Sequence, residues 1–106
     1  AKDALKVVRF VNSDSIGILL DTFHMNIEED SFKAAVQSTE GGLEHTHFAD
    51  NNRKLPGFGH IDFHMIMKSL KKISYRKYVS FEPNIFDTSY DDDLETSLKF
   101  VRNLTT

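Results

Sequence analysis

The amino-acid sequence predicts an α/β protein built on a parallel sheet. Short apolar runs alternate with longer stretches in which apolar residues recur every three or four positions, so the expected order is α-β-α-β-α-β-α. The repeat is close to the roughly 30 residues of a βαβ unit. Alternation of this kind is typical of parallel strands joined by right-handed helical crossovers. The runs are so apolar that each strand is expected to be buried on both faces.

The first half of the chain supplies two helices and one strand. Residues 3–12 carry apolar side chains on one side of a helix and basic side chains mostly on the other. A strand is expected over 16–21. An acidic segment, 28–31, then suits the start of a short helix, which ends before the glycines at 41–42.

The second half supplies two strands and two helices. A strand is expected over 43–49, followed by a long turn-rich loop over 50–60 of the kind that is usually functional or disordered. Asp62 can cap the next helix, whose apolar residues recur at helical spacing. The third strand covers 78–82, and the acidic triplet 91–93 opens a final helix.

Composition and charge exclude several classes of function. The 106 residues fit a single domain, and 40% apolar and 27% charged residues are ordinary for a globular protein. A net charge of −3 argues against nucleic-acid binding, which needs a basic surface. No apolar run approaches the roughly 20 residues that cross a bilayer, and no secretory pattern is present. Because there is no cysteine, disulfides and thiol nucleophiles are excluded, and we expect a cytoplasmic protein.

Three parallel strands with their helices on one side leave the other sheet face and both edges open. A closed (β/α) barrel of about 250 residues removes this difficulty. Residues 1–106 are therefore expected to be the C-terminal part of such a barrel, with its last three βα units and the helix before them. The first residue, Ala1 rather than methionine, agrees with this expectation. Such a chain should form homo-oligomers or associate with the missing part of the barrel.

Each predicted strand ends in side chains that can bind a ligand. Asp21 and His24 follow the first strand. His47 lies near the end of the second strand, and Glu82 ends the third. Because ligands bind at the carboxyl ends of parallel strands, these side chains are expected to meet at one rim. In the plainer alternatives, Asp21 caps a turn and Glu82 is a surface acid.

The remaining basic residues near this rim also have plainer alternatives. His45 and His47 lie two residues apart and therefore share a face of their strand. His47 is nearer the rim and is the candidate ligand, whereas His45 is expected to be a packed supporting or core histidine. His24 could be an exposed loop histidine, and Arg53 could be a solvated residue of the long loop.

Five stretches of the sequence resemble one known superfamily. They are Leu20–Glu29, His45–His47, Asn52–Arg53, Pro56–Asp62 and Phe81–Pro83. Together they resemble the sugar isomerase/epimerase superfamily with a xylose isomerase-like TIM barrel, and in particular the ketose 3-epimerases of the D-tagatose/D-psicose type. The fold that this resemblance implies is a partial TIM (β/α)8 barrel.

The resemblance implies a divalent metal ion, manganese, cobalt or magnesium, held by two glutamates, an aspartate and a histidine. At the matching positions, Asp21, His47 and Glu82 would be three of these ligands. The other glutamate lies on an earlier strand in the family and would precede this chain. His24 and Arg53 would bind oxygens of the sugar substrate, for which a guanidinium fork is well suited.

One departure from the family pattern lies directly after the second strand. Family epimerases often carry Gly-Glu there, whereas this chain has Ala49-Asp50. The difference bears on the sugar rather than on the metal site.

The activity implied is epimerisation of a free ketose at C3 through an enediolate, with two carboxylates sharing the proton transfers and Glu82 as one of the two. Because the second carboxylate would lie outside this chain, the chain alone is expected to be inactive toward sugars and to bind metal weakly. Hydroxypyruvate isomerase and inosose dehydratase are alternative activities of the same superfamily. A DNA-repair enzyme of the endonuclease IV type would need more zinc ligands and a basic face, which the sequence lacks. The non-enzymatic alternative is a self-associating βα fragment.

Overall fold

The structure is a computed structural model that describes residues 1–84 and 90–105. None of the helices in these residues is long and apolar enough to cross a membrane. In chain order the elements are α1 (Lys2–Val11), β1 (Ile18–Asp21), α2 (Thr22–Glu28), α3 (Phe32–Ser38), β2 (Leu43–Phe48), α4 (Phe63–Lys72), β3 (Val79–Phe81) and α5 (Tyr90–Asn103).

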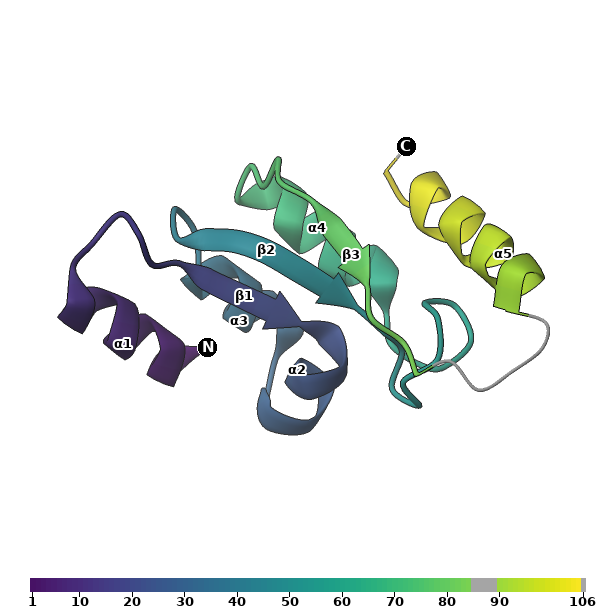
Figure 1. Cartoon of the computed structure of the whole chain (residues 1–106), viewed down its shortest axis with the longest axis horizontal. Coiled ribbons are helices and arrows are strands. Elements are labelled where there is room, and N and C mark those ends of the chain that lie inside the picture. Colours follow the sequence, from purple (N-terminus) through teal and green to yellow (C-terminus); the bar gives the residue numbers. More distant parts are fainter. Residues whose placement is uncertain (85–89, 106) are drawn as a thin grey trace.

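The three strands form one parallel sheet in the order β1-β2-β3, which confirms the predicted α/β architecture (Figure 1). The register pairs Asp21 with His47, and Phe48 with Phe81. The carboxyl ends of all three strands therefore lie along one edge of the sheet, as the alternation of elements predicts.

Helix α2 is the one element that the sequence pattern did not predict. It occupies seven residues directly after β1, where a strand end and loop were expected. Two turns are too short to display a helical period in the sequence. Strand β1 also begins at Ile18 rather than at residue 16. The Ile18 N–H donates to Gly42 C=O at 2.9 Å.

The hydrophobic core lies between the sheet and the helices α3 and α4, which stand behind it in Figure 1. Phe48 is fully buried, and its ring centroid is 5.1 Å from that of Phe63 on α4. Ile66 and Leu70 of α4 complete this contact surface, and Asp62 caps the helix by accepting the Met65 N–H at 3.0 Å. The predicted cap and apolar stripe of this helix are both confirmed.

The opposite face of the sheet is open in this chain. Leu19, in the middle of β1, is 48% exposed, so the expectation that the strand is buried on both faces is wrong for these residues. Helix α1 contains no buried residue, and its Phe10 is 90% exposed. This is the pattern of part of a barrel, in which further βα units would cover the apolar residues that are bare here.

Helix α5 packs against the loop that follows β2 and against α4. The Ser97 hydroxyl donates to the Pro56 carbonyl at 2.6 Å, and the Phe100 ring lies 6.4 Å from Phe63 in an edge-to-face arrangement. The loop is thereby held between the core and the last helix.

Candidate metal centre

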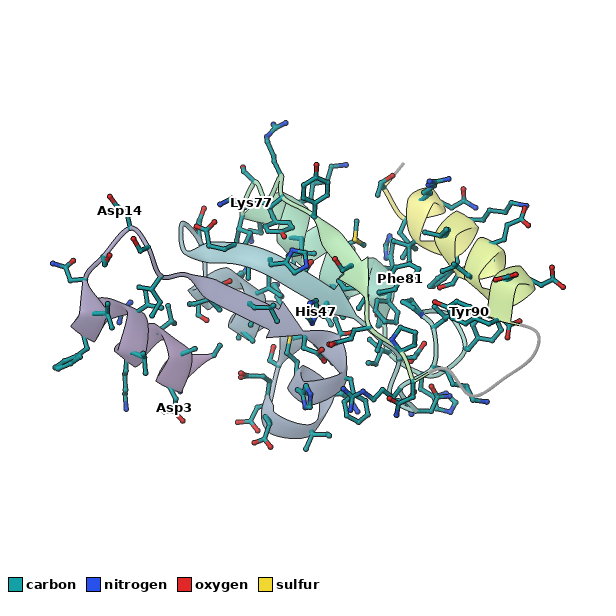
Figure 2. All side chains as sticks on the ribbon, in the orientation of Figure 1. Asp3, Asp14, His47, Lys77, Phe81 and Tyr90 are labelled. Carbon is teal, nitrogen blue, oxygen red and sulfur yellow. The ribbon has the colours of Figure 1, made fainter. Side chains whose placement is uncertain are left out.

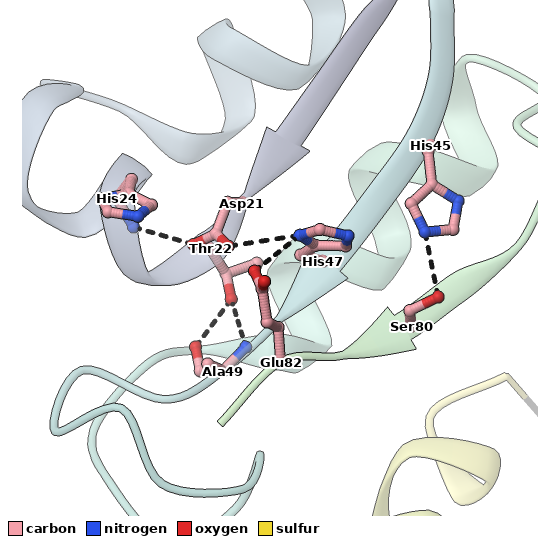
Figure 3. Close-up of polar contacts among 8 residues, drawn as sticks. All are labelled: Asp21, Thr22, His24, His45, His47, Ala49, Ser80 and Glu82. Atoms are coloured by element: carbon pink, nitrogen blue, oxygen red, sulfur yellow. Dashed lines mark hydrogen bonds and ion pairs between the residues drawn. The ribbon is translucent and has the colours of Figure 1, made fainter. Parts of the chain in front are cut away.

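The structure brings together the acid, the histidine and the glutamate that end the three strands (Figure 3). His47 Nδ1 lies 2.7 Å from Glu82 Oε2 and 3.6 Å from Asp21 Oδ2. One ligand atom from each of the three residues lies within 4.8 Å of the others. Figure 2 shows His47 by the carboxyl ends of β1 and β2.

The strand register explains why these side chains converge. Asp21 pairs with His47 across the β1–β2 ladder, so their side chains share a face. His47 pairs with Ser80 on β3, and Glu82 lies two residues beyond Ser80 on that same face. Alternation along each strand places all of them on the open face, opposite the helices.

Two contacts fix the backbone at this rim. The buried Thr22 hydroxyl donates to Ala49 C=O at 2.7 Å and accepts the Ala49 N–H at 2.9 Å, which ties the end of β1 to the end of β2. The Glu82 N–H donates to Phe48 C=O at 3.0 Å, which ties β3 to β2. The three candidate ligands therefore start from backbone positions that are held together.

Asp21 divides its two carboxylate oxygens between two roles. Oδ1 accepts the His24 N–H at 3.1 Å and caps helix α2. Oδ2 faces His47. The cap and the ligand were alternatives in the sequence, and the structure accommodates both at once. The cap also orients the carboxylate, because it fixes one oxygen and aims the other at the cluster.

The donor set and spacing fit a divalent ion. Carboxylate oxygens and an imidazole nitrogen suit manganese, cobalt or magnesium better than a metal that prefers thiolates. An octahedral ion with bonds of about 2.1 Å needs adjacent ligand atoms about 3 Å apart and opposite ones about 4.2 Å apart. The observed separations of 2.7 and 3.6 Å are close to these values. The side chains are 10% (Asp21), 24% (His47) and 51% (Glu82) exposed, so the cluster is open to solvent and to a ligand.

His45 lies beside this cluster on the same face. Its Nε2 is 2.9 Å from the Ser80 hydroxyl, and its ring stands edge-to-face with His47 at 5.2 Å between centroids. His45 is half-buried, so a position deep in the core is not observed, and its supporting role toward His47 stays a prediction.

The two residues expected to bind substrate both contact one aromatic ring, that of Phe23. His24 is exposed and stands edge-to-face with Phe23 at 5.2 Å. The Arg53 guanidinium carbon lies 4.9 Å from the centroid of the same Phe23 ring, in cation–π contact. Because Phe23 is two residues beyond Asp21, this stack lies next to the metal cluster without belonging to it. Phe23 thus contacts both of these basic groups.

Sequence reasoning passed over Asp50 as a functional residue. It is fully buried, and its carboxylate accepts four backbone N–H groups of the loop that follows β2. The available signal was its position, since an acid directly after a strand and before a loop with two glycines is well placed to organise that loop.

Comparison with family models matches residues 1–104 to the family described as the xylose isomerase-like TIM barrel. The chain belongs to this family. The predicted resemblance and the partial TIM-barrel fold are confirmed.

Relatives in the family are sugar epimerases. D-psicose 3-epimerase of Agrobacterium fabrum (strain C58) is 40% identical over 83 residues, which cover 78% of this chain and 29% of the relative. The 3-dehydro-D-guloside 4-epimerase of Escherichia coli (strain K12) is 41% identical over 70 residues, which cover 66% of this chain and 27% of the relative. The crystal structure of D-psicose 3-epimerase with D-tagatose from Clostridium cellulolyticum H10 gives a TM-score of 0.91 at 30% identity and covers 98% of this chain and 43% of that one. The chain thus spans less than a third of these two curated relatives.

Proposed function

We propose that the chain is the C-terminal part of a metal-dependent sugar epimerase that inverts a free ketose at C3. The observation that carries this proposal is the convergence of Asp21, His47 and Glu82 at the ends of three adjacent parallel strands. Membership of the TIM-barrel family and likeness to a D-psicose 3-epimerase favour a ketose as the substrate.

In this proposal Asp21, His47 and Glu82 bind a manganese, cobalt or magnesium ion. When bound, such an ion polarises the ketose carbonyl and acidifies the neighbouring C–H bond. His47 offers Nδ1, which faces both carboxylates. A fourth ligand, the glutamate that the family carries on an earlier strand, would come from outside residues 1–106.

Glu82 is proposed to move the proton as well as to bind the ion. One of its oxygens faces His47, and half of the side chain is exposed on the open face. Its carboxylate would take the proton from C3, and the electron pair of the broken C–H bond would pass into the carbonyl to give an enediolate. A second carboxylic acid, from outside this chain, would return a proton to the opposite side of C3.

His24 and Arg53 are proposed to bind substrate oxygens. His24 presents an exposed imidazole, and Arg53 presents a guanidinium that Phe23 holds in place. A planar guanidinium donates two parallel hydrogen bonds, which suits neighbouring hydroxyl groups of a sugar. Their positions beside Asp21 favour recognition of the part of the sugar that extends away from the reacting carbon.

Epimerisation at C4 is a second candidate. It is favoured by the likeness to the Escherichia coli 4-epimerase, which covers two thirds of this chain. The same cluster could serve either reaction if a sugar with its carbonyl at C3 binds with C4 in the place that C3 of a 2-ketose would take.

We also propose that the open face of the sheet is covered in the active protein. Leu19 and the exposed residues of α1 would be buried either by further βα units or by a second copy of the chain. The mass of the chain in solution, measured by light scattering, separates a monomer from an oligomer.

The function can be tested by grafting. We would replace the matching segment of the Agrobacterium fabrum D-psicose 3-epimerase with this chain, since the matched region is 40% identical and solved relatives share its fold. The graft should exchange deuterium from solvent into C3 of D-fructose and form D-psicose in the presence of manganese. Asp21→Asn, His47→Gln and Glu82→Gln should each abolish this exchange. A folded graft that binds manganese but leaves C3 of the 2-ketoses unexchanged would contradict the proposal. Exchange at C4 of a 3-keto sugar would favour the second candidate.

A further inference from the structure

The buried carboxylate of Asp50 forms the centre of the loop that joins β2 to α4. Oδ1 accepts the N–H groups of Asn51 and Ile61 at 2.9 and 3.0 Å. Oδ2 accepts those of Gly57 and Gly59 at 3.0 and 2.9 Å. Four N–H groups from one to eleven residues away thus bind one fully buried side chain, so the loop is folded around the carboxylate.

This arrangement of the loop requires glycine at positions 57 and 59. A Cβ on Gly59 would collide with the side chains of Asp50 and Asn51. Gly57 has φ of +98°, a conformation that side chains other than glycine's rarely adopt. The loop therefore has little freedom to hold the carboxylate in another way.

The same loop sets the position of Arg53. The Arg53 N–H donates to Asp50 C=O at 2.9 Å, and the Asp50 N–H donates to Lys54 C=O at 2.9 Å. These bonds close a tight turn in which Arg53 has φ of +59°, which is unfavourable for a residue with a side chain. The Arg53 carbonyl accepts the Asn84 N–H at 2.8 Å, so the turn is also tied to the segment that follows β3.

We propose that Asp50 is a positioning residue for substrate recognition. By gathering the loop around its carboxylate, it holds Arg53 in a left-handed turn from which the guanidinium reaches the Phe23 ring at the rim. Asp50 is fully buried and is not one of the three residues of the metal cluster. The link to substrate rests on the proposed function, whereas the link to Arg53 rests on the loop alone.

The metal cluster should be insensitive to this loop. Asp21 and His47 lie on strands β1 and β2. The carboxyl ends of these strands are joined by the bonds of the Thr22 hydroxyl to the Ala49 backbone, and not by the loop. Glu82 is held to β2 by its own N–H. Loss of the Asp50 carboxylate is therefore expected to separate sugar recognition from metal binding.

The test compares three variants of the whole chain by NMR and manganese titration. Asp50→Asn places an NH2 group against N–H donors, and Gly59→Ala displaces the loop while leaving the carboxylate intact. Asp62→Asn is the matched control, because Asp62 is an exposed acid of the same region that accepts one backbone N–H, as asparagine also can. In the wild-type chain, the Arg53 side-chain protons should show upfield ring-current shifts from Phe23.

Asp50→Asn and Gly59→Ala should both lose these shifts and keep the manganese affinity within about threefold, whereas Asp62→Asn should keep both. In the grafted enzyme, Asp50→Asn should raise KM at least about tenfold with a much smaller change in kcat, and Asp50→Glu should recover part of the loss because the charge is retained. Should Asp50→Asn not fold, Gly59→Ala provides the same readout.

Ring-current shifts that survive in either folded variant would overturn the proposal, and so would unfolding of both variants, because Asp50 would then govern the stability of the whole chain. A graft without activity would count against the proposed function alone, since the NMR result on the chain does not depend on catalysis.

Discussion

The two faces of the sheet use the same three strands for opposite purposes. On the face covered by α3 and α4, Leu20 and Phe48 are at most 6% exposed and belong to the hydrophobic core, where Phe48 packs against Phe63. On the open face, the adjacent residues of the same strands, Asp21 and His47, approach one another to 3.6 Å between Oδ2 and Nδ1. Because side chains alternate between faces, a single residue step separates a group that stabilises the fold from one that can bind an ion. The polar residues of the open face can therefore be substituted with little effect on the hydrophobic core.

The largest expected effect comes from the covered face. Phe48→Ala should lower the free energy of unfolding by about 3–5 kcal/mol, because it removes a fully buried ring and leaves a cavity. Urea unfolding followed by circular dichroism measures this change. Leu19→Ala, on the open face of β1, should cost about 0.5 kcal/mol or less in the monomer because Leu19 is half-exposed. Equal losses for the two variants would show that the faces are not energetically distinct.

Substitutions of the polar residues on the open face should change metal binding. His47→Gln and Glu82→Gln should weaken manganese binding at least about 100-fold, since even removal of a residue that only supports a metal ligand costs 10–100-fold. Titration followed by electron paramagnetic resonance measures the affinity. The control is Glu44→Gln, an exposed acid at the other end of β2 that pairs with Lys77. If Glu44→Gln weakens binding as much, the ion is held by diffuse charge and not by the cluster.

The contact of the Thr22 hydroxyl with Ala49, which joins the ends of β1 and β2, should affect both stability and manganese affinity. Thr22→Val leaves the buried N–H and C=O of Ala49 without their partner, which should cost about 1–3 kcal/mol in stability. It should also weaken manganese binding roughly tenfold, because the positions of Asp21 and His47 are no longer tied. Thr46→Val serves as control, since its hydroxyl also donates to a backbone carbonyl, that of Tyr78 just before β3, but away from the rim. An unchanged manganese affinity in Thr22→Val would mean that the ladder alone aligns the ligands.

The smallest effect is expected for an ion pair fully on the surface. On α5, the hydrogen bond and charge of Lys99, at 2.9 Å, hold the pKa of Glu95 below its ordinary value. A lowered pKa stabilises the fold above the ordinary pKa of glutamate, and the gain is lost as the pH falls through the lowered value. Lys99→Ala should therefore reduce the unfolding temperature slightly at neutral pH and not in strong acid, as thermal melts at both conditions would reveal. A pH-independent difference would mean that Lys99 contributes through packing.

Much of this fold was predictable because it depends on local patterns. The ten residues of α4 show almost three turns of apolar spacing after Asp62, and both the helix and its cap follow from that pattern. The meeting of Asp21, His47 and Glu82 was predictable in kind, since parallel strands present their carboxyl ends at the same edge. The seven residues of α2 were missed because their pattern is too short to distinguish a helix from a loop.

The sequence by itself determined the alternation of elements, the polar residues at the strand ends and the family to which they point. Only the tertiary structure decided which groups those residues meet. The position of Asp50 after a strand indicates a role in its loop, but the sequence does not show which groups its carboxylate binds. Its partners are backbone N–H groups, which every residue other than proline carries. The contact of Arg53 with Phe23 likewise joins two segments 30 residues apart, and only the packing of β1 beside β2 brings them together.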